Sequence, residues 1–406
     1  MREILFLSHR IPFPPDRGDK IRSWNILKRL GETARVHLAT FADDETDAAH
    51  LPALREAMGG SLGEAHVEIR TTGKAAAGAK ALLSGRPVSL TAFDSATLRG
   101  FVHRIAAERD LAAVFAFSGQ MAQFVPSGPR FIMDFVDMDS AKFESYAGAG
   151  PLPLRWLMRR EADKLFAFES AVAARADASL FVSEAEAALF RTRTGLSGVR
   201  ALSNGIDVDF FDPAADFSRL PAEERGEGPL LLFTGQMDYR PNVEAVCTFA
   251  RNVMPQLPGV RFAIAGRKPA SEVLALREQG TIVTGEVPDI RSWLSAADIV
   301  VAPLGIARGI QNKVLEAMAM AKPVVASPAA FEGIEAEPGR DLVLASPAEQ
   351  AAAIRHLLAH PAKAREIALA ARRRMEEAYR WNARLADLET IVFGDGVTEA
   401  ERKAAA

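Results

Sequence analysis

GIARGIQNKVLEAMAMAKPVVAS, residues 305–327, is the stretch that decides the fold. The apolar run at 298–304 precedes it and the run at 322–327 closes it, a pattern typical of strands buried on both faces. Between these runs Leu315, Met318 and Ala319 recur at helical spacing. The stretch therefore predicts a strand, a helix and a second strand, the βαβ unit of a parallel sheet.

The start of this predicted helix is a candidate anion site. Gly305 and Gly309 free the backbone for close approach to a ligand, and the N–H groups of a helix start favour phosphate. The polar residues around it are Arg308, Asn312, Lys313 and Glu316. The two cations add positive charge, and the carboxylate one turn on accepts hydrogen bonds from sugar hydroxyls. The alternative is an ordinary crossover with a solvated charged rim.

Length and composition limit the class of protein. A chain of 406 residues with 49% hydrophobic and 25% charged residues is globular and long enough for two large domains. A net charge of −3, without a long run of Lys or Arg, does not suggest a nucleic-acid partner, and we expect none.

The cellular compartment follows from the cysteine count and the apolar runs. Cys247 is the only cysteine, so no intramolecular disulfide is possible, which fits the cytoplasm. No apolar run approaches the roughly 18 residues of a membrane span, so we expect any membrane contact to be peripheral.

Strand and helix patterns alternate in the first half, as in a parallel sheet wound with helices. Residues 9–20, rich in Pro and charge, read as a loop that excludes helix, and residues 71–86 as a mobile loop with a weak helix. A helix is predicted at 21–30, and strands are predicted at 2–8, 36–41, 113–117, 130–135 and 178–183.

The second half repeats this pattern. Residues 207–228 read as a linker, after which strands are predicted at 230–234, 261–266, 281–284 and 298–304 and a helix at 243–249. Two Rossmann-like halves imply a cleft where ligands bind at the carboxyl ends of strands. The tail at 346–388 is predicted to be helical and broken at His360–Pro361.

Three segments of the second half carry a resemblance to a known family. They are residues 305–327, SNGID at 203–207 and FTGQMDYRPNVEAV at 233–246. Together they resemble the nucleotide-binding half of GT-B glycosyltransferases, specifically the family 4-like retaining enzymes. Residues 8–25, 134–147 and 179–190 are similar to the sugar transferases associated with PEP-CTERM/exosortase polysaccharide systems.

The resemblance implies an α/β protein with two Rossmann-like domains facing a central cleft. It implies an acceptor-side domain at 1–206 joined by a C-terminal helix at about 378–395, a linker at 207–228, a nucleotide-sugar-binding domain at 229–377 and a tail at 396–406. The implied reaction moves a hexosyl group with retention from a nucleotide-diphosphate sugar to a glycan or lipid-linked acceptor, in exopolysaccharide biosynthesis. It needs no metal or other cofactor.

The resemblance also assigns donor residues. The family's two glutamates, which have seven residues between them, fall on Arg308 and on Glu316, which would hold the ribose hydroxyls. Two basic positions of the family are neutral here, at Gln236 and Asn242. We therefore expect that other cations hold the diphosphate. The donor set is Arg308, Lys313, Glu316, Asn312, Gly309, Gly235, Arg240 and Asn204, of which Arg308 and Lys313 are also candidate catalytic residues.

In the first domain, Gly18 matches one glycine of a family pair near the donor phosphates, and the resemblance makes its charged neighbours Arg17, Asp19 and Lys20 candidates for acceptor contact. A solvated loop tip is the alternative. Where many relatives have a sugar-contacting His, this chain has Ser118 and Gln120. The possible substitutes are His9 and His103.

Two acids lie at the carboxyl end of the predicted strand at 130–135. Functional sites of α/β proteins concentrate at this end of their strands. Asp134 and Asp137 are candidates for a general base or a hydroxyl clamp. The alternative for this run is a helix cap at Asp139 and Ser140.

The predicted helix at 152–168 is basic and carries Trp156. Such a helix can lie on an anionic membrane or contact a lipid-linked acceptor. The alternative is a core helix whose long charged side chains extend to the solvent at its edge. Two other functions stay open from the sequence: a GT-B sugar-nucleotide epimerase and a catalytically inactive GT-B binding module.

Overall fold

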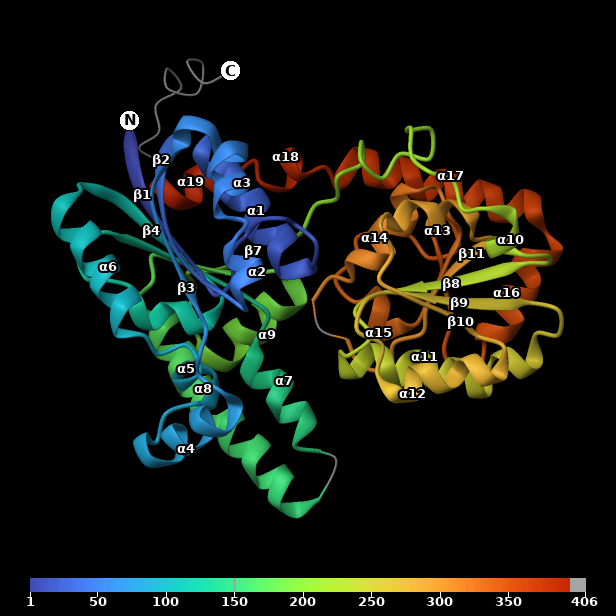
Figure 1. The fold of residues 1–406 in the computed structure, drawn as a ribbon, viewed down its shortest axis with the longest axis horizontal. Helices are drawn as coiled ribbons and strands as arrows, with labels where there is room; N and C mark the ends of the chain where they lie inside the picture. The colour runs from blue at the N-terminus through green and yellow to red at the C-terminus, as the bar shows by residue number, and fades with distance from the viewer. Residues whose placement is uncertain (149–150, 308, 395–406) are drawn as a thin grey trace. The chain divides into compact units, whose positions relative to one another are not determined.

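A computed structural model describes residues 1–148, 151–307 and 309–394. The chain forms two compact units, one from residues 1–203 together with the segment that begins at Leu385, the other from Asn204–Arg384 (Figure 1). Each is a parallel sheet with helices packed on it, so the α/β class and the two Rossmann-like domains are confirmed.

The sheet of the first unit has seven parallel strands in the order β3-β2-β1-β4-β5-β6-β7. Their bounds are β1 Arg2–Ser8, β2 Ala34–Ala42, β3 Leu62–Ile69, β4 Leu111–Phe117, β5 Arg130–Val136, β6 Ala178–Phe181 and β7 Val199–Ala201. The central strands are mostly apolar and buried along most of their length, which explains their clear sequence signal.

The helices of this unit lie on both faces of the sheet (Figure 1). They are α1 Gly18–Gly31, α2 Glu45–Ala48, α3 Leu51–Met58, α4 Lys74–Ser84, α5 Val88–Thr91, α6 Ala96–Glu108, α7 Asp139–Tyr146, α8 Leu152–Arg175, α9 Glu184–Thr194 and α19 Leu388–Phe393. The prediction that residues 9–20 exclude helix was wrong at its end, because α1 begins at Gly18, beyond the last proline. The weak helix expected within 71–86 is α4, in a stretch rich in Ala, the strongest helix former.

The sheet of the second unit has six parallel strands in the order β10-β9-β8-β11-β12-β13. Their bounds are β8 Leu230–Thr234, β9 Arg261–Ala265, β10 Ile282–Gly285, β11 Ile299–Ala302, β12 Val324–Ala326 and β13 Val343–Leu344. The helices are α10 Ala222–Arg225, α11 Arg240–Asn252, α12 Ser271–Leu274, α13 Ile290–Ala296, α14 Asn312–Ala319, α15 Pro328–Phe331, α16 Gln350–Ala359, α17 Pro361–Ala378 and α18 Trp381–Arg384. The opening stretch is thus β11, α14 and β12, as predicted.

The segment at 207–228, predicted as a linker, lies within the second unit. Its aromatic side chains hold it there, because the Arg291 guanidinium lies 4.0 Å from the ring centroid of Phe210 and 4.9 Å from that of Phe217. Arg372 adds hydrogen bonds to the carbonyls of Val208 (2.8 Å) and Phe211 (2.7 Å).

The C-terminal helices break at His360, where α16 ends and α17 follows, as predicted. Beyond α18 the chain joins the first unit through α19. Glu389 there forms an ion pair with Arg29 at 2.9 Å, and Arg130 donates a hydrogen bond to the Ile391 carbonyl at 3.2 Å. Across the described residues, we find no helix with both the length and the apolar character of a membrane span.

Candidate functional site

The second unit has its topological switch point between β8 and β11, which lie side by side and whose following loops lead to α11 and α14. Ligands of open α/β sheets bind at such a point, outside the carboxyl ends of the strands. The predicted donor residues Gly235, Lys313 and Glu316 lie here, on the loop after β8 and on α14.

Two glycines let the loops at this edge pack closely. Gly266 has a φ of +159°, and a Cβ there would lie 1.6 Å from the Gly235 carbonyl oxygen. Gly235 has a φ of +151°, and its Cβ would lie 2.9 Å from Asn242 Nδ2 and 3.1 Å from Lys313 Nζ. Gly235 is therefore required beside the lysine, whereas Gly266 was missed, although its place directly after an apolar strand was a signal for it.

Lys313 turns its ammonium group toward the loop after β8. Its Nζ donates to Asn242 Oδ1 at 2.7 Å and lies 4.1 Å from the ring centroid of Phe233. Asn242 Nδ2 in turn donates to the Gln236 carbonyl at 2.8 Å, which orients the amide. Burial lowers the pKa of Lys313 to about 7, although Glu316 opposes that shift.

Glu316 lies three residues after Lys313, so the two side chains share one face of α14. Burial raises the pKa of Glu316 to about 7, and the charge of Lys313 opposes this. The site therefore holds an amine and a carboxyl group that both change charge near neutral pH. Such perturbed groups at strand ends are typical of functional sites.

The start of α14 is tied to the SNGID segment. Asn204 Nδ2 donates to Asn312 Oδ1 at 3.2 Å. Gln311 precedes the helix and does not cap it with its side chain, which donates to the Gly309 carbonyl at 3.3 Å. The N–H groups in the first turn of α14 therefore lie at the carboxyl edge of the sheet and receive no capping hydrogen bond from the Gln311 side chain.

Two other predicted donor cations are placed differently. Arg240 is the first residue of α11, not part of the loop, and its exposed side chain pairs with Glu244 at 2.6 Å. Arg308, the residue at the family's first glutamate position, lies outside the described residues. Among the described cations, Lys313 is therefore the stronger candidate for a diphosphate contact.

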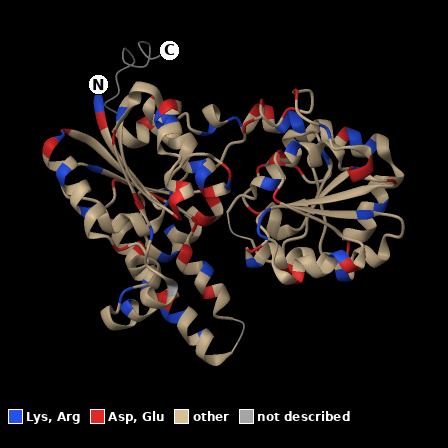
Figure 2. Cartoon of the chain, viewed as in Figure 1, with Lys and Arg blue, Asp and Glu red and all other residues tan. Residues whose placement is uncertain are grey.

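The candidate acceptor residues of the first unit belong to an ion-pair network around α2 and the loop into α1, where Figure 2 shows charges of both signs. Asp19 contacts His9 (3.2 Å), Arg10 (2.6 Å) and Arg17 (3.0 Å). Burial raises the pKa of Asp19, but the hydrogen bonds and charges of His9 and Arg10 outweigh it and hold the pKa below its usual range. Lys20 pairs with Asp47 at 2.5 Å. Gly18 directly precedes Asp19 and Lys20 and is the first residue of α1.

Asp134 is fully buried in the first unit. Arg22 donates to both of its oxygens, at 2.9 Å and 3.1 Å, and the Val136 N–H also donates, at 3.1 Å. Burial raises the pKa of Asp134, and the charge of Arg22 opposes this. These contacts join α1 to β5 and favour a structural role for Asp134 over the predicted catalytic one.

Asp137 follows β5 and has a buried Oδ1 without a hydrogen-bond partner. Burial, and then the charge of Glu186, raises its pKa to about 7. Nearby Glu169 accepts a hydrogen bond from Ser140 Oγ at 2.5 Å, and burial raises its pKa to about 8. Asp137 therefore has a pKa near neutral pH, which suits a general base. Its role as a general base stays a prediction.

The remaining candidates lie at different places in this unit. Ser118, after β4, has a φ of +75° and contacts Gln120. His9, after β1, stacks on Phe117 with ring centroids 5.9 Å apart, so it lies at the same edge of the sheet. His103 is exposed on α6, within the helix rather than at a strand end.

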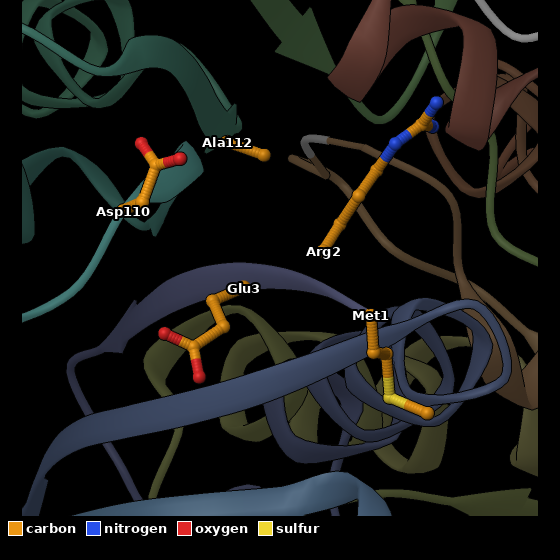
Figure 3. A pocket seen from close by; sticks show the side chains of 5 residues that line it. All are labelled: Met1, Arg2, Glu3, Asp110 and Ala112. Atoms are coloured by element: carbon orange, nitrogen blue, oxygen red, sulfur yellow. The ribbon is translucent and has the colours of Figure 1, made fainter.

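A hollow lies at the opposite edge of this sheet. Figure 3 shows Met1 and, at the start of β1, Arg2 and Glu3 around it, with Asp110 just before β4 and Ala112 within it. These are the amino ends of the strands, so the hollow is separate from the candidate site. In the described part of the chain, no group of three His, Cys, Asp or Glu is arranged to hold a metal ion.

Solved structures share this architecture over nearly the whole chain. Sucrose-phosphate synthase from Thermosynechococcus elongatus superposes with a TM-score of 0.71, at 18% identity and with full coverage of both chains. The fold is GT-B. Two further GT-B structures are Anabaena HepE in complex with UDP and glucose (TM-score 0.69, 17% identity, 96% of this chain and 98% of that one) and WaaG, described as a glycosyltransferase involved in lipopolysaccharide biosynthesis (0.66, 15%, 97% and 100%).

Sequence comparison, like structural comparison, finds similarity to glycosyltransferases. Residues 228–360 match the family model described as Glycosyl transferases group 1. A phosphatidyl-myo-inositol mannosyltransferase of Propionibacterium freudenreichii subsp. shermanii is 29% identical over 157 residues, 38% of this chain. The match spans 39% of that mannosyltransferase's length. Gly235, Lys313 and Glu316 all lie within the segment that matches the family.

Proposed function

We propose that this chain is a glycosyltransferase that moves a sugar from a nucleotide-diphosphate donor to an acceptor hydroxyl. The observation that carries the proposal is that Lys313 lies beside Gly235 at the switch point of the second unit, with Glu316 on the same face of α14. The group 1 match over residues 228–360 supports it, and so does the UDP in the HepE structure of the same fold.

The residues of the site suit the chemistry of a departing nucleoside diphosphate. Negative charge develops on the leaving group, and preorganised positive charge in a partly buried site stabilises it most effectively. The Lys313 ammonium and the first-turn N–H groups of α14 would supply that stabilisation. The Glu316 carboxylate would accept hydrogen bonds from the ribose hydroxyls, as the family pattern implies.

The finer features of the proposal are retention of configuration, a hexosyl donor, a glycan or lipid-linked acceptor and a role in exopolysaccharide biosynthesis within a PEP-CTERM/exosortase system. The resemblance of residues 8–25, 134–147 and 179–190 supports them. We also propose that the reaction needs no metal, and that the protein works in the cytoplasm, in peripheral contact with the inner face of the cytoplasmic membrane.

Thermal unfolding in the presence of nucleotides tests the donor site. A ligand that binds only the native state raises the unfolding temperature by mass action. We expect UDP or GDP to raise it in the native protein and to have little effect on a Glu316→Ala variant. A folded protein whose unfolding temperature responds to no nucleoside diphosphate contradicts the proposal.

Turnover separates the proposed transferase from the two alternatives. A transferase consumes the nucleotide sugar only when a hydroxyl-bearing acceptor is present, whereas an epimerase converts it without one. The substitution of Arg308 for the family's first glutamate favours an inactive binding module as the second candidate. Binding of UDP without turnover on any acceptor would support that candidate.

A further inference from the structure

Large apolar side chains are exposed together on one part of the first unit. They lie on the last turn of α4 and the first turns of α8, and their exposed fractions are 57% for Leu82, 91% for Leu83, 77% for Leu152, 44% for Leu154 and 63% for Trp156. The only other large hydrophobic side chain exposed to this degree among the described residues of the unit is that of Met1. Exposed apolar groups that gather in this way mark an interaction surface.

Contacts of α8 with α4, and with α5 directly after it, hold these residues on one surface. Arg160 of α8 donates to the Ala81 carbonyl at 2.9 Å and to the Arg86 carbonyl at 3.3 Å. Glu161 accepts hydrogen bonds from the N–H groups of Val88 (2.9 Å) and Ser89 (3.1 Å). Trp156 lies one turn before Arg160 on the same face of α8. In Figure 1, α4 and the start of α8 extend away from the sheet of this unit.

The two stretches that form this surface carry only positive charge. Residues 75–86 and 151–160 contain five Lys or Arg and no Asp or Glu, although the whole chain has a net charge of −3. Arg155 and Arg159 are exposed beside the apolar residues of α8. Two acids from outside these stretches offset part of the charge: Asp94 pairs with Lys80 at 2.7 Å and lies 3.6 Å from Arg86, and Glu161 lies 3.9 Å from Arg160. Arg155 and Arg159 are in none of these pairs.

We infer that the surface of residues 75–86 and 151–160 docks on a lipid bilayer that contains anionic headgroups. Leucine and tryptophan side chains enter the boundary of headgroups and acyl chains, and surrounding cations attract anionic lipids. The combination of an apolar centre with an excess of positive charge fits such a bilayer better than it fits a second copy of this acidic chain. The inference rests on the proposed function only for the expectation that the acceptor is lipid-linked.

Vesicle sedimentation with the full-length protein tests the surface. We expect binding to vesicles of phosphatidylcholine with phosphatidylglycerol, and much weaker binding to vesicles of phosphatidylcholine alone. Each cation near an anionic surface contributes about a fivefold change in partitioning, so Arg155→Gln with Arg159→Gln should weaken binding about 25-fold. A Leu83→Ser, Trp156→Ser variant should also lose most of the binding, because its apolar contact is removed.

The matched control is Leu369→Ser with Arg373→Gln, an apolar and a basic residue exposed on α17 of the second unit. It should bind vesicles as the native protein does. Absence of binding, or equal binding by the control and the surface variants, would overturn the inference. So would a dimer in light scattering that the Leu83→Ser, Trp156→Ser variant abolishes without any vesicle binding. The response of the unfolding temperature to UDP, measured on the same variants, tests the donor site separately.

Discussion

Lys313 donates a hydrogen bond to Asn242 across 2.7 Å, from the start of α14 to the first turn of α11. Asn242 occupies a position where the resembled family has a basic residue. An ammonium group therefore stands next to that position although the residue itself is neutral. This contact supports the hypothesis that another part of the same site, here Lys313 of α14, supplies the positive charge that Asn242 lacks.

The first prediction concerns the charge of Lys313. We expect Lys313→Gln to weaken UDP binding about 10- to 100-fold, because a hydrogen bond from a charged group is lost. Calorimetric titration of UDP measures the change. Lys322→Gln is the control, since that lysine is directed to the carbonyls of Ser295 (2.6 Å) and Ala297 (3.0 Å). An equal effect of both substitutions on UDP affinity would count against a diphosphate contact.

The pH dependence of UDP binding is the second prediction. Burial lowers the pKa of Lys313 to about 7 in the folded protein, so above this pH the amine is neutral and must take up a proton to face a diphosphate. UDP affinity should therefore fall as the pH rises above about 7, by at most tenfold per pH unit. The Lys313→Gln variant should lose this part of the dependence, and any dependence that stays belongs to Glu316. A flat profile for the native protein would argue that Lys313 does not contact the ligand.

Much of the fold could be predicted, because buried central strands are continuous apolar runs. β1 and β8 were placed from such runs alone. The edge strands β3, β7 and β13 were not predicted. In β3, polar residues interrupt the apolar ones, so the strand is not a continuous apolar run, and β7 and β13 have only three and two residues. A strand of that length carries no periodicity to detect.

The candidate site could be predicted only where its residues are close in sequence. Lys313 and Glu316 share a helix face by their spacing, which the sequence shows. The contact between Lys313 and Asn242 joins residues 71 positions apart, and the Arg22–Asp134 pair spans 112 positions. Such contacts depend on how loops leave the sheet, so the pairing of Asp134 with Arg22 could not be predicted from the sequence.

The third prediction is that Glu316→Ala weakens donor binding and leaves the fold intact. A carboxylate that accepts hydrogen bonds from ribose hydroxyls contributes about 1.5–3 kcal/mol, or roughly 10- to 100-fold in affinity. Removing it relieves the burial that raises the pKa of Glu316 to about 7 but also takes away the carboxylate that opposes the lowered pKa of Lys313, so we expect these two effects on stability to offset each other in large part. Calorimetry with UDP and with UDP-glucose measures the affinity. Glu244→Ala, an exposed acid on α11, is the control and should bind as the native protein does.

The fourth prediction assigns Asp134 to the structure of the first unit. Asp134→Asn leaves Arg22 buried without its charged partner, and breaking such a pair costs about 3–5 kcal/mol. Replacing both residues, as Arg22→Met with Asp134→Leu, should cost less, because no buried charge remains. Urea unfolding followed by circular dichroism measures both. If Asp134→Asn abolishes turnover at unchanged stability, the catalytic role first predicted for Asp134 would be supported instead.

The last prediction concerns the close approach of the loops after β8 and β9. Gly266→Ala would place a Cβ 1.6 Å from the Gly235 carbonyl oxygen, which forces one of the two loops to move. Gly259→Ala is a matched control, since its φ is also positive, at +77°, but no atom lies within 4 Å of the added Cβ. The control should lose about 1 kcal/mol of stability from its left-handed backbone alone. Gly266→Ala should lose more than that and also weaken UDP binding, because Gly235 lies beside Lys313; equal unfolding temperatures for the two variants would show that the loops yield without cost.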